Sequence, residues 1–281
     1  MPADFICYLF DNGSFRADST RSLRGLAARL SQRLSHEVCA VSLLHSTRVK
    51  AEELDGVPAQ LLEPALDEWF GRNPSGRALL LPLFFGPSGA LVDYVPERLA
   101  SLGKKYPHAR AILAEALVLP DEEPHELVAI LADRVRAVVQ ERAWVKPCVV
   151  LCDHGTPLKS VTEVRDRLAA KLSDVLRGEV AEVAPASMER REGDEYAFNE
   201  PLLATRLATP PFDQGNVVVA LQFLSPGRHA GPGGDVAEIC RAAEEARPGL
   251  CTAMSAPIAD DPRLVEVLAR RAETALARLL A

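Results

Sequence analysis

FICYLFDNGS, residues 5–14, returns in the second half of the chain as PCVVLCDHGT, residues 147–156. Each stretch is an apolar segment that ends in Asp, a polar residue, Gly and a hydroxyl-bearing residue. A short, continuously apolar segment that ends in a glycine turn is typical of a strand covered on both faces of a parallel sheet. The two stretches therefore predict the same strand and turn, used twice.

Two further blocks of sequence repeat in the same order. LPLFFGPSGALVDYVPERLA (residues 81–100) corresponds to VALQFLSPGRHAGPGGDVAEI (219–239), and VLPDEEPHELVAILADRVRA (118–137) corresponds to SAPIADDPRLVEVLARRAET (255–274). The matched blocks lie 138 to 142 residues apart. Self-similarity at a fixed spacing indicates a tandem duplication. We expect two domains, residues 1–142 and residues 147–281.

Strand and helix patterns alternate within each half. In the first half, strands are expected over residues 5–10, 36–44, 77–85 and 108–117, and helices over residues 18–34, 58–70, 96–105 and 124–140. Alternation of this kind predicts a mainly parallel sheet with helices on both faces. The predicted fold class is α/β, with two tandem-duplicated, doubly wound parallel-sheet domains and a cleft between them.

The composition is that of an ordinary soluble globular protein, with 48% hydrophobic and 25% charged residues in a chain of 281. The net charge of −7 gives no basic surface for nucleic acid. No apolar segment approaches the roughly 20 residues that span a bilayer. The first ten residues, MPADFICYLF, lack the features of a secretion signal, so a cytoplasmic location is expected. The six cysteines show no CxxC spacing and are expected to be reduced thiols in the core.

Two histidines lie at equivalent strand ends of the second half. His154 comes directly after the first strand of the second half, and His229 lies in the loop after its third strand, where the first half has Asn12 and Ala90. In open α/β sheets, ligands bind at the carboxyl ends of the strands, near the point where the strand order reverses. If the two strands are adjacent, both imidazoles converge on one bound atom. The remaining histidines are expected to be solvated or bonded to backbone: His36, His45, His108 and His125.

The glycine-rich loop around His229 does not match a phosphate-binding motif. The chain has neither GxxxxGK[ST] nor GxGxxG after a strand, and it has no GxSxG turn of a serine hydrolase. A structural zinc site would need four ligands at close spacing. Two histidines leave such a site incomplete and indicate an open metal site that exchanges its ion.

The acidic segment that follows the second strand of the second half supplies candidates for a third ligand or a proton acceptor. Glu189 is the closest acid to the strand end and is the favoured one, while Glu192, Glu195 and Glu200 fit a solvated surface. Arg190, Arg191 and Arg228 are available for carboxylates of a substrate, which a guanidinium binds in a bidentate manner.

Three of these segments carry a family resemblance that covers nearly the whole chain as two copies. DHGT after the first strand, FLSPGRHAGPGGDV after the third and the ending DDPRLVEVLARR resemble the class II tetrapyrrole chelatases. More specifically, they resemble the two-repeat form of the sirohydrochlorin cobaltochelatase/ferrochelatase family of cobalamin and sirohaem synthesis.

The resemblance implies two α/β domains that clasp a planar tetrapyrrole, with no organic cofactor and a divalent ion, Co²⁺, Fe²⁺ or Ni²⁺, as a substrate. It implies that His154 and His229 bind the ion and help to remove pyrrole protons, assisted by Glu189. The implied substrate-binding residues lie in the same loops: Arg228, Arg190, Gly227 and Thr156. Two other functions remain open, a non-catalytic tetrapyrrole or metal carrier and a porphyrin ferrochelatase. The sequence does not indicate an oligomeric state.

Overall fold

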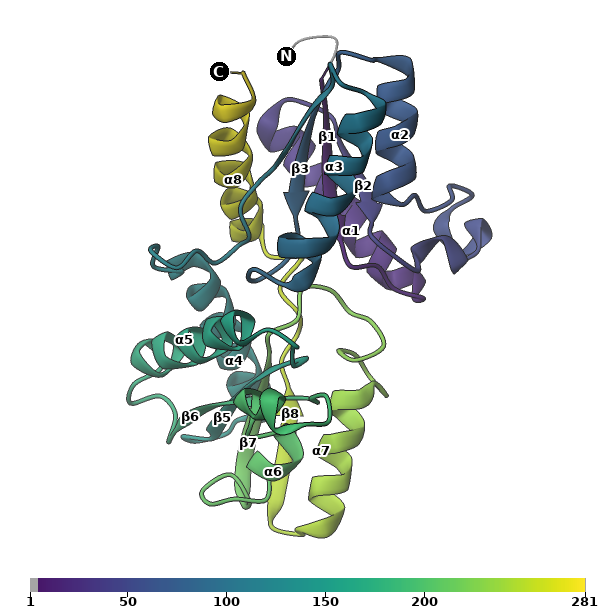
Figure 1. Ribbon diagram of the computed structural model, residues 1–281. Helices are drawn as coiled ribbons and strands as arrows, with labels where there is room; N and C mark the ends of the chain where they lie inside the picture. The colour runs from purple at the N-terminus through teal and green to yellow at the C-terminus, as the bar shows by residue number, and fades with distance from the viewer. Residues whose placement is uncertain (1–4, 281) are drawn as a thin grey trace. The chain divides into compact units, whose positions relative to one another are not determined.

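Eight parallel strands form two separate four-stranded sheets in the computed structural model, which describes residues 5–280 (Figure 1). The first sheet has the order β2-β1-β3-β4, and its strands are β1 (Phe5–Asp11), β2 (Val38–Ser42), β3 (Arg77–Pro82) and β4 (Arg110–Leu113). The second has the order β6-β5-β7-β8, with β5 (Cys148–Asp153), β6 (Val183–Ser187), β7 (Gly215–Leu221) and β8 (Leu250–Met254). The same strand order in both sheets confirms the predicted pair of parallel α/β folds.

Helices cover both faces of each sheet. The first sheet packs against α1 (Ala17–Leu34), α2 (Leu62–Arg72), α3 (Val95–Lys105) and α8 (Pro262–Leu280), with short helices η1 (Ser46–Arg48), η2 (Ala51–Leu54) and a π-helical turn η3 (Ala90–Tyr94) in its loops. The second sheet packs against α4 (His125–Arg142), α5 (Lys159–Val175), α6 (Leu203–Arg206) and α7 (Asp235–Ala246), with η4 (Asp194–Asn199) after β6. No helix within residues 5–280 combines the length and the apolar content that crossing a bilayer requires.

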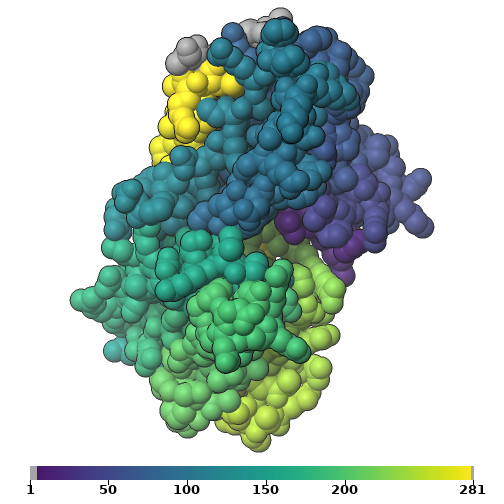
Figure 2. All heavy atoms as spheres, viewed as in Figure 1, coloured from purple at the N-terminus to yellow at the C-terminus, as the bar shows by residue number. Residues whose placement is uncertain are grey.

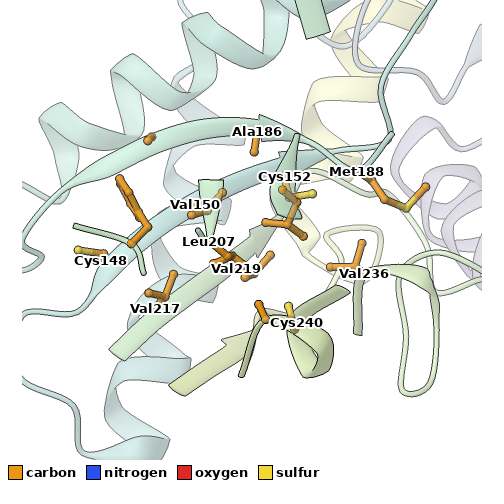
Figure 3. Close-up of a cluster of buried hydrophobic side chains, with 14 of the residues drawn as sticks. Cys148, Val150, Cys152, Ala186, Met188, Leu207, Val217, Val219, Val236 and Cys240 are labelled. Atoms are coloured by element: carbon orange, nitrogen blue, oxygen red, sulfur yellow. The ribbon is translucent and has the colours of Figure 1, made fainter. Parts of the chain in front are cut away.

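The central strands of the second sheet are buried on both faces. Figure 3 shows Val150 of β5 and Val219 of β7 in one apolar cluster with Leu207, next to α6, and Val236 of α7. Val149, the next residue to Val150 in β5, faces the other side of the sheet and is also fully buried. This two-sided burial explains why the strand is apolar throughout in the sequence.

The two compact units of the fold are divided differently from the two sequence halves. One unit contains the residues up to Glu122 together with those from Ala259 onward, and the other is Glu123–Ile258. Helix α4 therefore packs on α5 and β7, while α8 packs on α1, β3 and β4 (Figure 1). In Figure 2 the yellow atoms of α8 lie against teal atoms of the first unit. The expected domains 1–142 and 147–281 remain a prediction about the repeat, and they are not the compact units.

Burial of the terminal helix explains this division. Leu264 and Leu268 of α8 are fully buried in the first unit. Arg271 of α8 donates hydrogen bonds to the carbonyl oxygens of Ala116 and Leu117, both at 3.0 Å. Its guanidinium also lies 2.7 Å from a carboxylate oxygen of Glu122. These contacts hold α8 on the first sheet, although its sequence belongs to the second repeat.

Candidate metal centre

The structure brings His154 and His229 together. Strands β5 and β7 are adjacent and parallel, with Cys152 paired with Leu221, so the residues that follow them leave the same edge of the sheet. The two imidazole rings lie 4.6 Å apart between centroids and are nearly perpendicular, at 83°. The strand order reverses between β5 and β7, which is where α/β folds bind ligands.

A tight turn at Gly155 positions the backbone of His154. Gly155 has a φ of +93°, and a Cβ added there would lie 1.9 Å from the carbonyl oxygen of Glu189. The backbone N–H of Glu189 donates to the carbonyl of His154 at 3.2 Å, which continues the pairing of β5 and β6 beyond the strands. Only glycine fits this close approach of two backbones. The repeated Asp-x-Gly-hydroxyl pattern in the sequence is therefore explained by the turn.

The loop of His229 folds back onto the start of α7. The backbone N–H groups of Asp235 and Val236 donate to the carbonyl oxygens of Arg228 and His229, at 3.3 and 3.2 Å. Gly234 permits this contact, because a Cβ there would lie 2.6 Å from the carbonyl oxygen of Arg228. The first N–H groups of α7 are thus already bonded within the protein, which agrees with the absence of a phosphate-binding motif.

Both imidazoles are held through Nδ1. Nδ1 of His229 lies 2.5 Å from Oδ2 of Asp235, and Nδ1 of His154 lies 3.1 Å from the carbonyl oxygen of Gly155. A carbonyl or carboxylate oxygen accepts hydrogen bonds, so in each neutral ring the proton belongs on Nδ1 and the lone pair on Nε2. This is the arrangement in which a histidine binds a metal through Nε2 while a second group orients the ring.

Glu189 lies beside the histidine pair. Its Oε1 is 3.6 Å from Nε2 of His154. The side chains of His154, His229 and Glu189 are 47%, 31% and 60% exposed, so solvent reaches the site. Within residues 5–280, no group of three or more His, Cys, Asp or Glu side chains is arranged to hold a metal ion. The centre therefore offers two nitrogen ligands and a nearby carboxylate rather than a closed coordination shell.

The expected substrate-binding arginines have different surroundings. The side chain of Arg228 is 75% exposed, and its Nε lies 3.7 Å from Oδ2 of Asp235, next to His229. Arg190 instead donates to Oε1 of Glu200 at 2.7 Å and to the carbonyl of Gly193 at 2.9 Å, within its own loop. The guanidinium of Arg190 lowers the pKa of Glu200. The structure thus places Arg228 at the histidine pair and engages Arg190 elsewhere.

The two small residues of the expected set shape the loops. Thr156 accepts a hydrogen bond at Oγ1 from the backbone N–H of Leu158, at 3.1 Å, at the start of α5. The N–H of Gly227 donates to the carbonyl of Ala230 at 3.2 Å and closes the tip of the His229 loop. Both residues lie in the loops that carry the histidines, as expected.

Two acids at the site were not among the expected residues. Asp235 orients His229, and Asp153 lies buried under the turn, where its Oδ1 accepts from Oγ of Ser187 at 2.6 Å. Burial raises the pKa of Asp153, against the lowering effects of the Ser187 hydrogen bond and the positive charge of Arg165. The repeated aspartate of the two turns was the available signal for Asp153. For Asp235 the signal was an acid at the start of a helix, six residues after His229.

Solved structures show which known proteins share this fold. No protein-family model and no curated protein sequence matches the chain. A structure of SirB from Bacillus subtilis with Fe³⁺ matches with a TM-score of 0.68 at 13% identity, over 98% of each chain. The sirohydrochlorin chelatase SirB from B. subtilis subspecies spizizenii, in complex with cobalt, matches with a TM-score of 0.67 at 15% identity, over 97% of this chain and 95% of that one.

The chain has the fold of SirB. The resemblance to the class II chelatases is thereby confirmed for the architecture of both α/β units. At 13–15% identity the likeness does not carry residue roles from one chain to the other. The case for a function therefore depends on the histidine pair itself.

Proposed function

We propose that the chain is a metal chelatase that inserts a divalent ion into sirohydrochlorin or a closely related tetrapyrrole. The observation that carries this proposal is the pair of imidazoles 4.6 Å apart at the ends of adjacent strands, each held through Nδ1. The fold supports it, since it is shared with SirB structures that contain Fe³⁺ or cobalt.

The ligand set suits an ion that must be released again. Neutral imidazole binds Co²⁺, Fe²⁺ and Ni²⁺, and two such ligands leave coordination positions for water and then for the nitrogens of the tetrapyrrole. A closed site of four protein ligands would retain the ion, as structural zinc sites do. We propose Nε2 of His154 and Nε2 of His229 as the two protein ligands of the incoming ion.

Metal insertion also releases two protons from the pyrrole N–H groups, one for each charge of the divalent ion. An imidazole that gives up its metal regains a lone pair and accepts one of them, and the carboxylate of Glu189 accepts the other. Oε1 of Glu189 lies 3.6 Å from Nε2 of His154, so these two proton acceptors are close to each other. Solvent access at these side chains allows the protons to leave after the reaction.

The carboxylates of the substrate need a cation near the histidine pair. Arg228 is the residue we propose for this task, because its exposed guanidinium lies beside Asp235 and His229. Arg190 is a weaker candidate, since it would have to leave Glu200 before it binds a substrate. Gly227 and Thr156 contribute by shaping the two loops.

Anaerobic incubation with sirohydrochlorin and Co²⁺, Fe²⁺ or Ni²⁺, followed by absorbance, tests the proposal. The protein should accelerate insertion of at least one ion, and His154→Ala/His229→Ala should reduce the rate to that without enzyme. Asn12→Ala is the matched control, because Asn12 occupies the position of His154 in the first half. It should insert metal at the rate of the unmodified protein.

Each alternative function gives a different result. Insertion no faster than the enzyme-free rate with all three ions would exclude a sirohydrochlorin chelatase. Co²⁺ binding without insertion would then favour the carrier, and insertion into a porphyrin assayed in parallel would favour the ferrochelatase. Equal rates for the unmodified protein and the double histidine variant would show that the site lies elsewhere.

A further inference from the structure

A buried arginine lies behind the turn that carries His154. The side chain of Arg165, on α5, is 1% exposed. Its Nη1 donates to Oγ of Ser187 at 2.5 Å and to the carbonyl oxygen of Asn199 at 2.9 Å, and it lies 4.0 Å from Oδ1 of Asp153. A charged side chain is seldom buried to this degree unless all of its partners are supplied. Nε and Nη2 pair with Asp166, the next residue of α5, at 2.9 and 2.7 Å. Nη1 is the atom that points to the strand ends and to η4, the segments around the histidine turn.

Asn199 connects this network to the other side of the turn. It is fully buried, its Oδ1 accepts from the backbone N–H of Thr156 at 2.9 Å, and its Nδ2 donates to the carbonyl oxygen of Thr156, also at 2.9 Å. On the other side, Ser187 donates to Asp153 at 2.6 Å. The residue immediately before His154 and the second residue after it are thus both bound to one buried polar network.

The first unit contains the same turn, with Asp11 beside Ser42, and has leucines in place of Arg165 and Asn199. Gly13 has a φ of +91°, and a Cβ there would lie 1.7 Å from the carbonyl oxygen of Leu44, as Gly155 does against Glu189. Leu23 occupies the position of Arg165, twelve residues after the turn aspartate, and it is fully buried. Helix η2 packs on α1 as η4 packs on α5, and η2 ends in the buried Leu54. The turn therefore folds with leucines behind it.

This comparison within one chain separates what the turn needs from what the histidine needs. Arg165 and Asn199 are present in the unit that carries His154 and His229, and leucines take their places in the unit that has Asn12 and Ala90. We propose that Arg165 and Asn199 are positioning residues that hold residues 153–156 so that the imidazole of His154 faces His229. The proposal rests on the proposed function only in taking these imidazoles as the metal ligands.

The decisive variant installs the apolar arrangement of the first unit in the second. Arg165→Leu/Asn199→Leu should fold, because the first unit folds with Leu23 and Leu54. Its Co²⁺ affinity should fall by about 10- to 100-fold, the range seen when groups that orient metal ligands are removed. In the metal-free protein, the ring-proton NMR signals of the two histidines should lose the mutual shifts that a perpendicular contact at 4.6 Å produces.

Arg24→Leu is the matched control. Arg24 of α1 donates to the carbonyl oxygens of Leu54, Val57 and Pro58 at 3.2, 2.8 and 3.0 Å, so it ties a loop to its helix as Arg165 does, in the unit without the histidines. Its replacement should lower the thermal unfolding temperature and leave the Co²⁺ affinity within twofold. A comparable loss of Co²⁺ affinity in Arg24→Leu would overturn the proposal, since it would reflect general loosening.

A milder variant decides the matter if the double variant does not fold. Asn199→Ala keeps Arg165 and its contact with Asp153 and removes the two bonds to Thr156. It should weaken Co²⁺ binding about tenfold and change the histidine ring signals. Unchanged binding and unchanged ring signals in a folded variant would overturn the proposal. Neither measurement needs a tetrapyrrole, and the ring signals need no metal, so failure of the proposed insertion would not obscure this result.

Discussion

Replacing Asp235 tests whether a carboxylate prepares His229 for metal. Oδ2 of Asp235 lies 2.5 Å from Nδ1 of His229, and the Asp235 side chain is 33% exposed. A hydrogen bond to an ionised group is roughly twice as strong as one between neutral groups, and it fixes the proton on Nδ1. Loss of such a partner typically weakens metal binding 10- to 100-fold, which corresponds to about 1.4–2.7 kcal/mol.

Asp235→Asn should show the lower end of this range, because the amide oxygen can still accept the hydrogen bond, and Asp235→Ala the upper end. The assay is titration with Co²⁺ followed by its visible absorbance. Glu238→Gln is the matched control, since Glu238 is an exposed acid in the same first turn of α7 and its replacement changes the net charge equally. Affinity within twofold for Asp235→Ala, or an equal loss in Glu238→Gln, would refute the assigned role of Asp235.

Three further variants test the scaffold. Gly155→Ala should lower the free energy of unfolding by more than about 3 kcal/mol, because its Cβ would lie 1.9 Å from a backbone oxygen, whereas Gly178→Ala, at a φ of +85° in open space, should cost about 1 kcal/mol in denaturant titrations. Burial raises the pKa of Asp11 to about 6, so its neutral form favours the folded state, and stability should fall as the pH rises from about 4 to 6. Asp11→Asn should abolish this loss of about 3 kcal/mol, and parallel curves for both proteins between pH 4 and 7 would contradict the assignment. Arg271→Met should lower the free energy of unfolding by about 2–4 kcal/mol, because two buried carbonyl oxygens would lose their hydrogen-bond donors. A smaller decrease in the free energy of unfolding, measured by denaturant titration, would argue against docking of α8 through this residue.

The pairing of the two histidines was predictable because it depends on topology. The alternation of strands and helices predicts parallel strands, which end at one edge of a sheet. The adjacency of β5 and β7 was the remaining condition, and the structure meets it. The sequence shows where His154 and His229 leave the sheet. The glycine turn after His154 and the backbone bonds of the His229 loop to α7 then bring the two rings together.

Other features were not predictable because they depend on which partner satisfies a group. Helices α4 and α8 end the two repeats with matching sequence patterns, so the repeat alone could not show that α8 packs on the first sheet. Arg190 was expected to bind substrate carboxylates, but in the structure it is bonded to Glu200 and to a backbone carbonyl of its own loop. Arg165 lies in a helix rich in charged residues, and the one signal for its burial was its position twelve residues after Asp153, where the first half has Leu23.

The proposed function accounts for a candidate metal centre that has few protein ligands. A site that stores an ion gains from additional ligands, since each adds to affinity and slows release. This centre has two imidazoles, side-chain exposures of 47% and 31%, and no third ligand in place among residues 5–280. Both rings are nevertheless well oriented: Asp235 holds His229, and the glycine turn positions His154. In the proposed chelatase, two well-oriented imidazoles would bind the ion and leave its other coordination positions to the acceptor nitrogens, which suits transfer of an ion better than its retention.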